Sequence, residues 1–260
     1  WVMVANYLPH TLVVLDARDL KLFKLIPVVN AKGDKTSRVS AVYDAAPRKS
    51  FVAALKDVPE VWEISYDPNA EPVAEGLVHD FQYKEGDFKP GFFYPRRTML
   101  KDYLDDFFFT QSYHEILGAS RTATKGQVIY LDGRKKVADL DLPGMPHLGS
   151  GITWKWKDPA GKERLVMASP NLNEGLITVI DLQTFENVKQ IRTRGPGFFM
   201  RSHENTRYAW TDSMMSKEHK NKLQIIDKET LEVVKEIAAP EGQTLAHVEF
   251  TKDGRYALAS

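Results

Sequence analysis

The 260-residue sequence predicts an all-β protein, specifically a β-propeller. Short apolar runs that end in an acidic residue recur along the chain, and the runs ending at Asp132, Asp181 and Asp227 are 49 and 46 residues apart. Neighbouring runs alternate apolar and polar residues with a period of two, which is typical of half-buried strands. No segment carries the long apolar stripe of an amphipathic helix. A repeat of about 45 to 50 residues made of short strands matches one four-stranded propeller blade.

Each repeat contains the same segments in the same order. A strand-like run such as RLVMAS comes first, an apolar run ending in aspartate follows, and a turn leads to an alternating run such as ENVKQIRT. Asp16 and Asp67 end the earlier members of the series, and an irregular stretch from about 71 to 100 interrupts it. We expect about five blades, the first and last incomplete. The alternative is a large β-sandwich, a fold that does not usually repeat one strand–turn–strand phrase so regularly.

Composition excludes several classes of protein. Lys+Arg and Asp+Glu are both 35, so there is no overall basic field for nucleic acid. No apolar stretch approaches the roughly 18 residues of a spanning helix, and we expect no membrane insertion. The absence of cysteine excludes disulfides and a covalently attached c-type haem within this stretch. Because the chain starts at Trp1 and stops within the strand-like run RYALAS, we expect residues 1–260 to be part of a single propeller domain truncated at both ends.

Candidate site residues lie where the chain returns to the first strand of each blade. That strand is innermost in a propeller, and the loop before it opens on the central channel, where sites are commonly built. With the RYALAS strand as a ruler, these loops carry Arg38, Asp105, His147 and His247. Imidazoles bind metals or haem iron and move protons near neutral pH, and arginine holds carboxylates with two hydrogen bonds. We predict that these four side chains converge on one end of the channel.

A structural role is the alternative for each candidate. A lone histidine in a β protein usually has a structural role, and the position of Asp105 is also compatible with a residue that caps a turn. His203, in FMRSHENTRY, is a further candidate contact to a cofactor, again with a structural alternative. No phosphate-binding loop, nucleophile elbow or helical zinc motif is present, and we assign no metal site made of protein ligands.

Five segments resemble one known family: SRVSAVYDAAPRKSFVAALKDVPEVWEISYD, LDDFFFTQSY, LPGMPHLGSGITW, GPGFFMRSHE and LAHVEFTKDGRYALAS. Together they are similar to the haem d1-binding eight-bladed propellers, which include the d1 domain of cytochrome cd1 nitrite reductase and proteins of haem d1 maturation. The resemblance covers essentially the whole chain. It implies an eight-bladed propeller in the full-length protein, haem d1 or its dihydro precursor as the bound tetrapyrrole, and a periplasmic location.

Two positions favour the maturation branch represented by dihydro-haem d1 dehydrogenase. The nitrite reductases carry distal histidines in phrases like LHDGGWD and PHPGRG; His147 in PHLGSG matches the second, but Asp105 stands at the first. The reductases also have glutamine where LAHVEF places His247. The resemblance therefore implies desaturation of a propionate to an acrylate, the last step of haem d1 biosynthesis for denitrification. It assigns His247 and His147 to catalysis, and Arg38, Asp105, His147 and His203 to tetrapyrrole binding.

The same resemblance implies partners. The electrons need an acceptor, and a c-type cytochrome outside this chain is the expected one, with nitrite reductase as a second partner. Three other functions stay open from the sequence: a non-catalytic carrier of the d1 precursor, the d1 domain of a nitrite reductase, and a protein-binding propeller.

Overall fold

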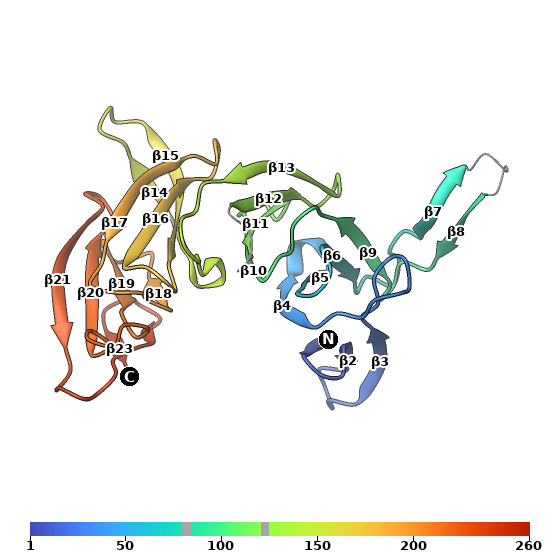
Figure 1. Cartoon of the computed structure of the whole chain (residues 1–260), viewed down its shortest axis with the longest axis horizontal. Helices are drawn as coiled ribbons and strands as arrows, with labels where there is room; N and C mark the ends of the chain where they lie inside the picture. The colour runs from blue at the N-terminus through green and yellow to red at the C-terminus, as the bar shows by residue number, and fades with distance from the viewer. Residues whose placement is uncertain (80–84, 121–124) are drawn as a thin grey trace. The chain divides into compact units, whose positions relative to one another are not determined.

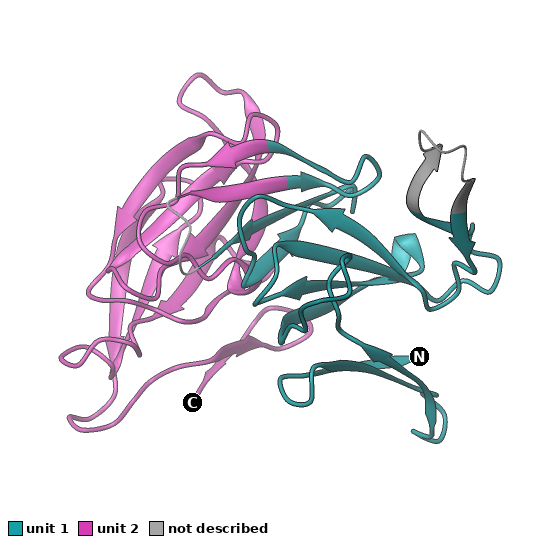
Figure 2. Ribbon diagram, turned by 45° about the vertical axis from the view of Figure 1, so that its right-hand side comes forward, with its two compact units in different colours: residues 1–123, 129–137 teal, residues 124–128, 138–260 magenta. Residues whose placement is uncertain are grey.

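The structure is a computed structural model that describes residues 1–79, 85–120 and 125–260 (Figure 1). It consists of two compact units: residues 1–123 with 129–137, and residues 124–128 with 138–260 (Figure 2). Antiparallel sheets make up both units, together with two short 3-10 helices, η1 (Ala46–Arg48) and η2 (Leu148–Ser150). In the described part of the chain, no helix is long and apolar enough to cross a membrane.

The first unit contains two sheets that follow one another in the sequence and a hairpin inserted into the second. The first sheet has the order β1 (Val2–Asn6), β2 (Thr11–Leu15), β3 (Leu22–Pro27). The second has the order β4 (Val39–Ala45), β5 (Ser50–Leu55), β6 (Glu60–Ser65), β9 (Pro95–Met99). Between β6 and β9 the chain forms a separate two-stranded sheet, β7 (Val73–His79) and β8 (Glu85–Lys89). This inserted hairpin accounts for the irregular stretch from about 71 to 100.

A third sheet is divided between the units and has the order β10 (Asp106–Phe109), β11 (Glu115–Ala119), β12 (Gly126–Tyr130), β13 (Lys135–Leu140). The second unit continues with two more four-stranded sheets. Their strands are β14 (Ile152–Lys157), β15 (Glu163–Pro170), β16 (Leu176–Asp181) and β17 (Asn187–Arg192), then β18 (Met200–Ser202), β19 (Tyr208–Asp212), β20 (Lys222–Asp227) and β21 (Glu232–Ala238). A two-stranded sheet follows, made of β22 (Val248–Phe250) and β23 (Ala257–Ala259).

The sheets have the organisation of propeller blades. Apart from the inserted hairpin, each sheet places its strands side by side in chain order. The first strands of successive four-stranded sheets, and of the last two-stranded sheet, contact one another: β4 with β10 in the first unit, and β14 with β18 and β18 with β22 in the second. Because the first strand is the innermost strand of a blade, these contacts are those of a β-propeller. The prediction of an all-β propeller built from four-stranded repeats is confirmed.

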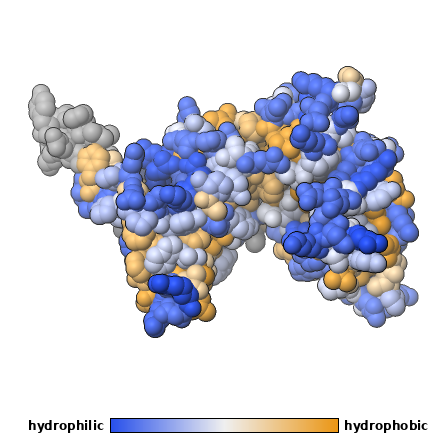
Figure 3. Space-filling model, turned by 180° about the vertical axis from the view of Figure 1, so that it is seen from behind, coloured by the Kyte–Doolittle hydropathy of each residue, from blue (hydrophilic) through white to orange (hydrophobic). Residues whose placement is uncertain are grey.

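Hydrophobic clusters fill the spaces between neighbouring sheets within each unit. Leu12 and Val14 of the first sheet pack in one cluster with Phe51 and Trp62 of the second. In the second unit, Val179 of β16 shares a cluster with Ala209 of β19 and Ile226 of β20. The outer strand of the first sheet instead exposes Leu22, Phe23 and Leu25. Hydrophobic surface is visible on this sheet at the lower left of Figure 3.

The recurring aspartates shape the turn between the third and fourth strands of a blade. The side chain of Asp181 is 2% exposed, and its Oδ1 accepts hydrogen bonds from the backbone N–H groups of Gln183 (2.7 Å) and Thr184 (3.3 Å). The Asp181 carbonyl accepts from Phe185 N, and Phe185 has a left-handed backbone with φ 60°. Asp16 and Asp227 begin equivalent turns, which end in left-handed leucines. The acidic repeat in the sequence therefore marks a turn that needs a carboxylate.

Replacing Asp181 by alanine should destabilise the protein by about 2 kcal/mol, because two turn N–H groups and Arg164 Nη1 lose their acceptor. Urea unfolding of the purified protein measures this change. Asp16→Ala is the matched control: its ion-pair partner Arg18 is 88% exposed, and the loss should be smaller. Equal losses for the two variants would contradict the importance of the buried cap.

Candidate functional site

In the second unit, four aromatic side chains lie in a continuous row. The ring of His147 lies 4.3 Å from that of Phe198, measured between centroids. Phe198 is followed by Phe199 at 4.6 Å. The ring of His247 lies 3.6 Å from that of Phe199, with an angle of 31° between the planes. We call these four residues the aromatic row. The structure thus connects two of the four predicted site residues through two phenylalanines.

His147 is fixed by its backbone and by one ring nitrogen. Its N–H donates to the Pro170 carbonyl at 2.9 Å, and its Nδ1 lies 2.7 Å from the Phe198 carbonyl oxygen. Because a carbonyl oxygen only accepts hydrogen bonds, Nδ1 carries the proton, and in the neutral ring Nε2 is the unprotonated nitrogen. The environment therefore selects both the orientation and the tautomer of His147.

The proline- and glycine-rich loop before His147 is organised by the buried side chain of Asn171. Asn171 Nδ2 donates to the Pro143 carbonyl at 2.6 Å, and Oδ1 accepts from Met145 N at 3.3 Å. Gly144 has φ +63°, and a Cβ there would lie 2.7 Å from Asn171 Nδ2. The Asn171 carbonyl accepts from Gly197 N at 3.0 Å, which ties this loop to the segment that contains the two phenylalanines.

The two phenylalanines are held by a buried carboxylate. Phe198 N donates to Asp212 Oδ1 at 2.8 Å, and Phe199 N donates to Asp212 Oδ2 at 2.9 Å. Asp212 is the last residue of β19 and is 1% exposed. A Cβ at Gly197 would lie 2.4 Å from the Asp212 carbonyl oxygen, so the backbones approach closely only with glycine here. Asp212 is not among the residues predicted from the sequence, although it ends a strand of the repeat, β19.

His247 is exposed and directly precedes β22. Its backbone is left-handed, with φ +47°, which is uncommon for a residue with a Cβ. Two backbone hydrogen bonds between Ala246 and Ser260 hold the adjacent residue, at 2.7 and 3.1 Å. With this backbone conformation, the His247 imidazole packs on the ring of Phe199.

Arg38 and Asp105 lie in the first unit, and each has a charged partner. Arg38 Nε and Nη2 donate to the two carboxylate oxygens of Asp57 at 2.8 and 2.6 Å. Lys56 Nζ lies 2.9 Å from Asp105 Oδ1. All four side chains line one cavity of about 470 Å³, together with His10, Lys35, Thr36, Tyr103 and Ser120. With three cations and two carboxylates, the lining of this cavity is slightly basic.

His203 has both ring nitrogens engaged with the backbone. Nδ1 accepts from Asn205 N at 3.1 Å, so Nε2 carries the proton that points at the Lys252 carbonyl, 3.2 Å away. Gly254 approaches so closely that a Cβ there would lie 2.4 Å from His203 Nδ1. This geometry supports the structural alternative for His203, since the ring connects two loops. The role of His203 in tetrapyrrole binding stays a prediction without geometric support.

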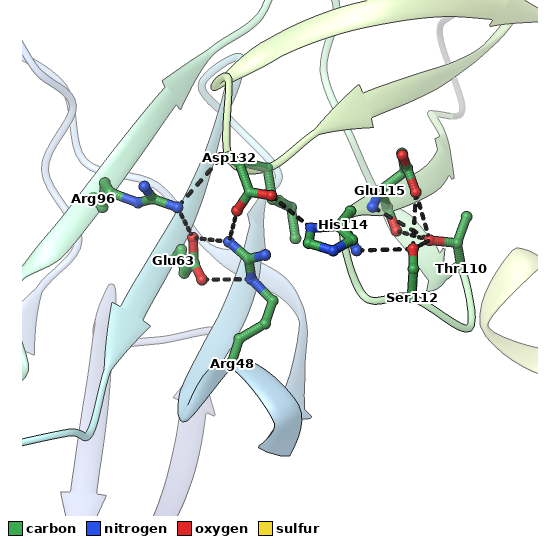
Figure 4. A network of polar contacts seen from close by, with 9 residues as sticks. Arg48, Glu63, Arg96, Thr110, Ser112, His114, Glu115 and Asp132 are labelled. Carbon is green, nitrogen blue, oxygen red and sulfur yellow. Dashed lines mark hydrogen bonds and ion pairs between the residues drawn. The ribbon is translucent and has the colours of Figure 1, made fainter.

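A network of ion pairs in the first unit was not predicted from the sequence (Figure 4). Arg48 bridges Glu63 and Asp132, both at 2.7 Å, and Arg96 adds a second ion pair to Glu63. Burial alone would raise the pKa of Glu63, but the hydrogen bonds from the two arginines outweigh it and hold the pKa below its usual value. His114 Nδ1 lies 2.6 Å from Asp132 Oδ2. Since Asp132 follows β12, the network joins the second and third sheets and has a structural role.

No group of three or more His, Asp or Glu side chains is placed to hold a metal ion among the residues with described positions. The aromatic row offers imidazoles on an apolar support, which can pack against a flat ligand, form hydrogen bonds and transfer protons.

The sequence pattern of the family described as cytochrome D1 heme domain matches residues 1–260. The chain belongs to this family. The chain is 50% identical, over all of its length, to a protein of Pseudomonas aeruginosa named dihydro-heme d1 dehydrogenase, and covers 47% of that protein. It is 26% identical over 97% of its length to Protein NirF of the same organism, of which it covers 59%. The D1 heme domain chain thus spans about half the length of the curated relatives that it matches.

The solved structures that are similar to the D1 heme domain chain include the following two. One is dihydro-heme d1 dehydrogenase NirN in complex with DHE, with a TM-score of 0.85, 50% identity, and coverage of 100% of this chain and 50% of that one. The other is hydrazine synthase of Kuenenia stuttgartiensis, with a TM-score of 0.54, 13% identity, and coverage of 90% and 55%. The second likeness shows the fold alone.

The D1 heme domain thus places its predicted site residues in two described groups. His147 and His247 lie in the aromatic row, and Arg38 and Asp105 line the cavity of the first unit. The prediction that all four converge on one end of a channel stays a prediction. The partner of Arg38 could not be anticipated from the strand pattern, because Asp57 lies 19 residues away, in the turn between β5 and β6.

Asp57 should make stability depend on pH. The hydrogen bonds from Arg38 hold the pKa of Asp57 at about 2, below its ordinary 3.8. A lowered pKa means that the stabilisation is complete above about pH 4 and is lost as the pH falls toward 2. The difference in urea midpoint between the natural protein and Asp57→Asn should therefore shrink over that range. In an Arg38→Gln background this pH dependence should disappear; a difference that stays constant with pH in the natural background would contradict the assignment.

Proposed function

We propose that this D1 heme domain chain belongs to an enzyme that binds dihydro-haem d1 and desaturates one of its propionates to an acrylate, the last step of haem d1 biosynthesis. The main observation that supports this proposal is the aromatic row, in which His147 and His247 pack against two phenylalanines. The 50% identity to a protein named dihydro-heme d1 dehydrogenase supports the choice of reaction. The similar structure that contains DHE supports the choice of ligand class.

The residues of the row fit a flat, largely apolar ligand. Ligand sites are lined mainly by aromatic and apolar side chains with a few fixed polar groups. Phe198 and Phe199 supply the apolar surface here, and both are only half-buried. His147 is a polar group whose tautomer is fixed, and we assign it to the distal side of the tetrapyrrole.

His247 is the proposed base. Converting –CH2–CH2– to –CH=CH– releases two protons and two electrons, and an exposed imidazole accepts one of the protons without a large change of environment. A bound tetrapyrrole supplies the redox chemistry, and a c-type cytochrome outside this chain is the proposed electron acceptor, with nitrite reductase as a further partner.

The cavity of the first unit is proposed to bind carboxylate groups, which the periphery of a d1-type tetrapyrrole carries. Lys35, Arg38 and Lys56 supply its positive charge, and Asp105 pairs with Lys56. A ligand carboxylate would compete with Asp57 for Arg38. Asp105 in this ion pair is a poor substitute for a distal histidine, which disfavours nitrite reduction.

We further propose that residues 1–260 form part of one propeller domain in a periplasmic protein. The family match over the whole chain supports a single domain. The greater length of the relatives and the exposed hydrophobic side chains of β3 support further blades. The location rests on the family alone.

Replacing His247 by alanine should leave binding of dihydro-haem d1 intact and lower its conversion at least ~100-fold, because the base is lost while the aromatic surface stays. The full-length protein is incubated with dihydro-haem d1 and an electron acceptor, binding is followed by absorbance, and the acrylate product is separated by chromatography. His114→Ala is the control, since it removes an imidazole from the ion-pair network of the first unit.

The outcomes separate the candidate functions. Conversion at the normal rate by His247→Ala would show that the base is another group. Binding without conversion by the natural protein would favour a carrier, and turnover of nitrite would favour a reductase. Absence of any ligand spectrum would leave a protein-binding propeller.

A further inference from the structure

Asp212 makes an unusual set of contacts for a buried acid. Its carboxylate accepts three backbone N–H groups, from Phe198 at 2.8 Å, Phe199 at 2.9 Å and Met214 at 3.1 Å. Among the described side chains, no cation forms an ion pair with it. Hydrogen bonds from backbone N–H to an ionised carboxylate are roughly twice as strong as those between neutral groups. The segment that receives this carboxylate is therefore held firmly.

One peptide group connects Asp212 to His147. The N–H of Phe199 and the carbonyl of Phe198 belong to the same peptide unit, whose atoms lie in one plane and point in opposite directions. The N–H donates to Asp212 Oδ2, and the carbonyl faces His147 Nδ1 at 2.7 Å. By fixing the N–H, Asp212 also fixes the direction of the carbonyl. The chain of hydrogen bonds further polarises that carbonyl, which favours a proton on His147 Nδ1.

The same carboxylate acts on the other end of the row. Phe199, whose N–H binds Asp212, carries the ring on which His247 packs at 3.6 Å. Thr211, adjacent to Asp212, donates its hydroxyl to the Phe199 carbonyl at 3.2 Å. The strand end Thr211–Asp212 thus holds Phe199 from both sides of its backbone.

Asp212 differs from Asp227, an aspartate that caps the turn after its own strand. Asp227 is also a buried acid at a strand end, and it accepts hydrogen bonds from the N–H groups of Glu229 and Thr230, two and three residues later. Asp212 also accepts from the residue two positions later, but its two shortest hydrogen bonds reach back to the loop before β18. Only the second pattern touches the aromatic row.

We infer that Asp212 is a positioning residue, which sets the tautomer of His147 through the Phe198–Phe199 peptide and the placement of His247 through the Phe199 ring. The inference deepens the proposed function and rests on it for the catalytic consequence. The structural consequence, a fixed Nδ1–H tautomer of His147, does not depend on the reaction.

The test uses the full-length protein with Asp212→Asn. The substitution keeps the shape of the side chain, but an amide NH2 group replaces one of the carboxylate oxygens that accept a backbone N–H. We expect kcat for conversion to fall about 10- to 100-fold, the range found for hydrogen-bond partners that orient metal-binding histidines, while the Kd for dihydro-haem d1 changes by less than about threefold. In parallel, NMR of the protein labelled with 15N-histidine reports the His147 tautomer, which should shift away from Nδ1–H.

Asp227→Asn is the matched control, because it weakens a buried cap that does not touch the row. It should lower the melting temperature at least as much, since Asp227 also pairs with Arg207, while kcat and the His147 tautomer stay unchanged. If Asp212→Asn lowers only the melting temperature, Asp212 is a structural cap and the inference is wrong.

Two further outcomes distinguish a failure of this inference from a failure of the proposed function and from a variant that does not fold. If the natural protein does not convert dihydro-haem d1, the proposed function fails, and the His147 tautomer in Asp212→Asn still decides the positioning role. If Asp212→Asn does not fold, the spectrum of the natural protein decides: an Nε2–H tautomer of His147 would overturn the inference.

Discussion

Buried carboxylates at strand ends, satisfied by backbone N–H groups, are the interactions on which both the repeat and the candidate site depend. A carboxylate removed from water needs hydrogen-bond donors, and the turn that follows a strand offers several unpaired N–H groups at once. Asp181 and Asp227 use them to close the turn to the outer strand. Asp212 uses N–H groups from another loop and thereby builds the aromatic row.

The site of the second unit is rigid because its loops are held by side chains from elsewhere in the fold. Asn171 organises the loop before His147, and its carbonyl also receives Gly197 N. The glycines at 144 and 197 are required by close approach, at the first position also by a left-handed backbone. Preorganisation of this kind lets an imidazole meet a ligand without losing much conformational freedom.

Charge in the first unit is mostly neutralised by neighbouring protein groups. Arg48 is shared by Glu63 and Asp132, and Arg38 is bound by Asp57. Arginines that already pair with carboxylates of the protein stabilise the contacts between sheets. A ligand carboxylate binds such an arginine only by displacing the carboxylate of the protein. This distinguishes the ion-pair network, which is structural, from the basic cavity around Arg38, whose ion pair is partly exposed.

The sequence by itself determined the all-β class, the four-stranded repeat, its turn aspartates and the positions of His147 and His247 before inner strands, because strand alternation and turn chemistry are local properties of the chain. Only the tertiary structure decided that Phe198 and Phe199 lie between the two histidines, that Asp212 holds them, that Asp57 occupies Arg38 and that both nitrogens of His203 serve the backbone. These depend on which loops meet in space and on the direction of each side chain, and a period of two residues carries no information about either.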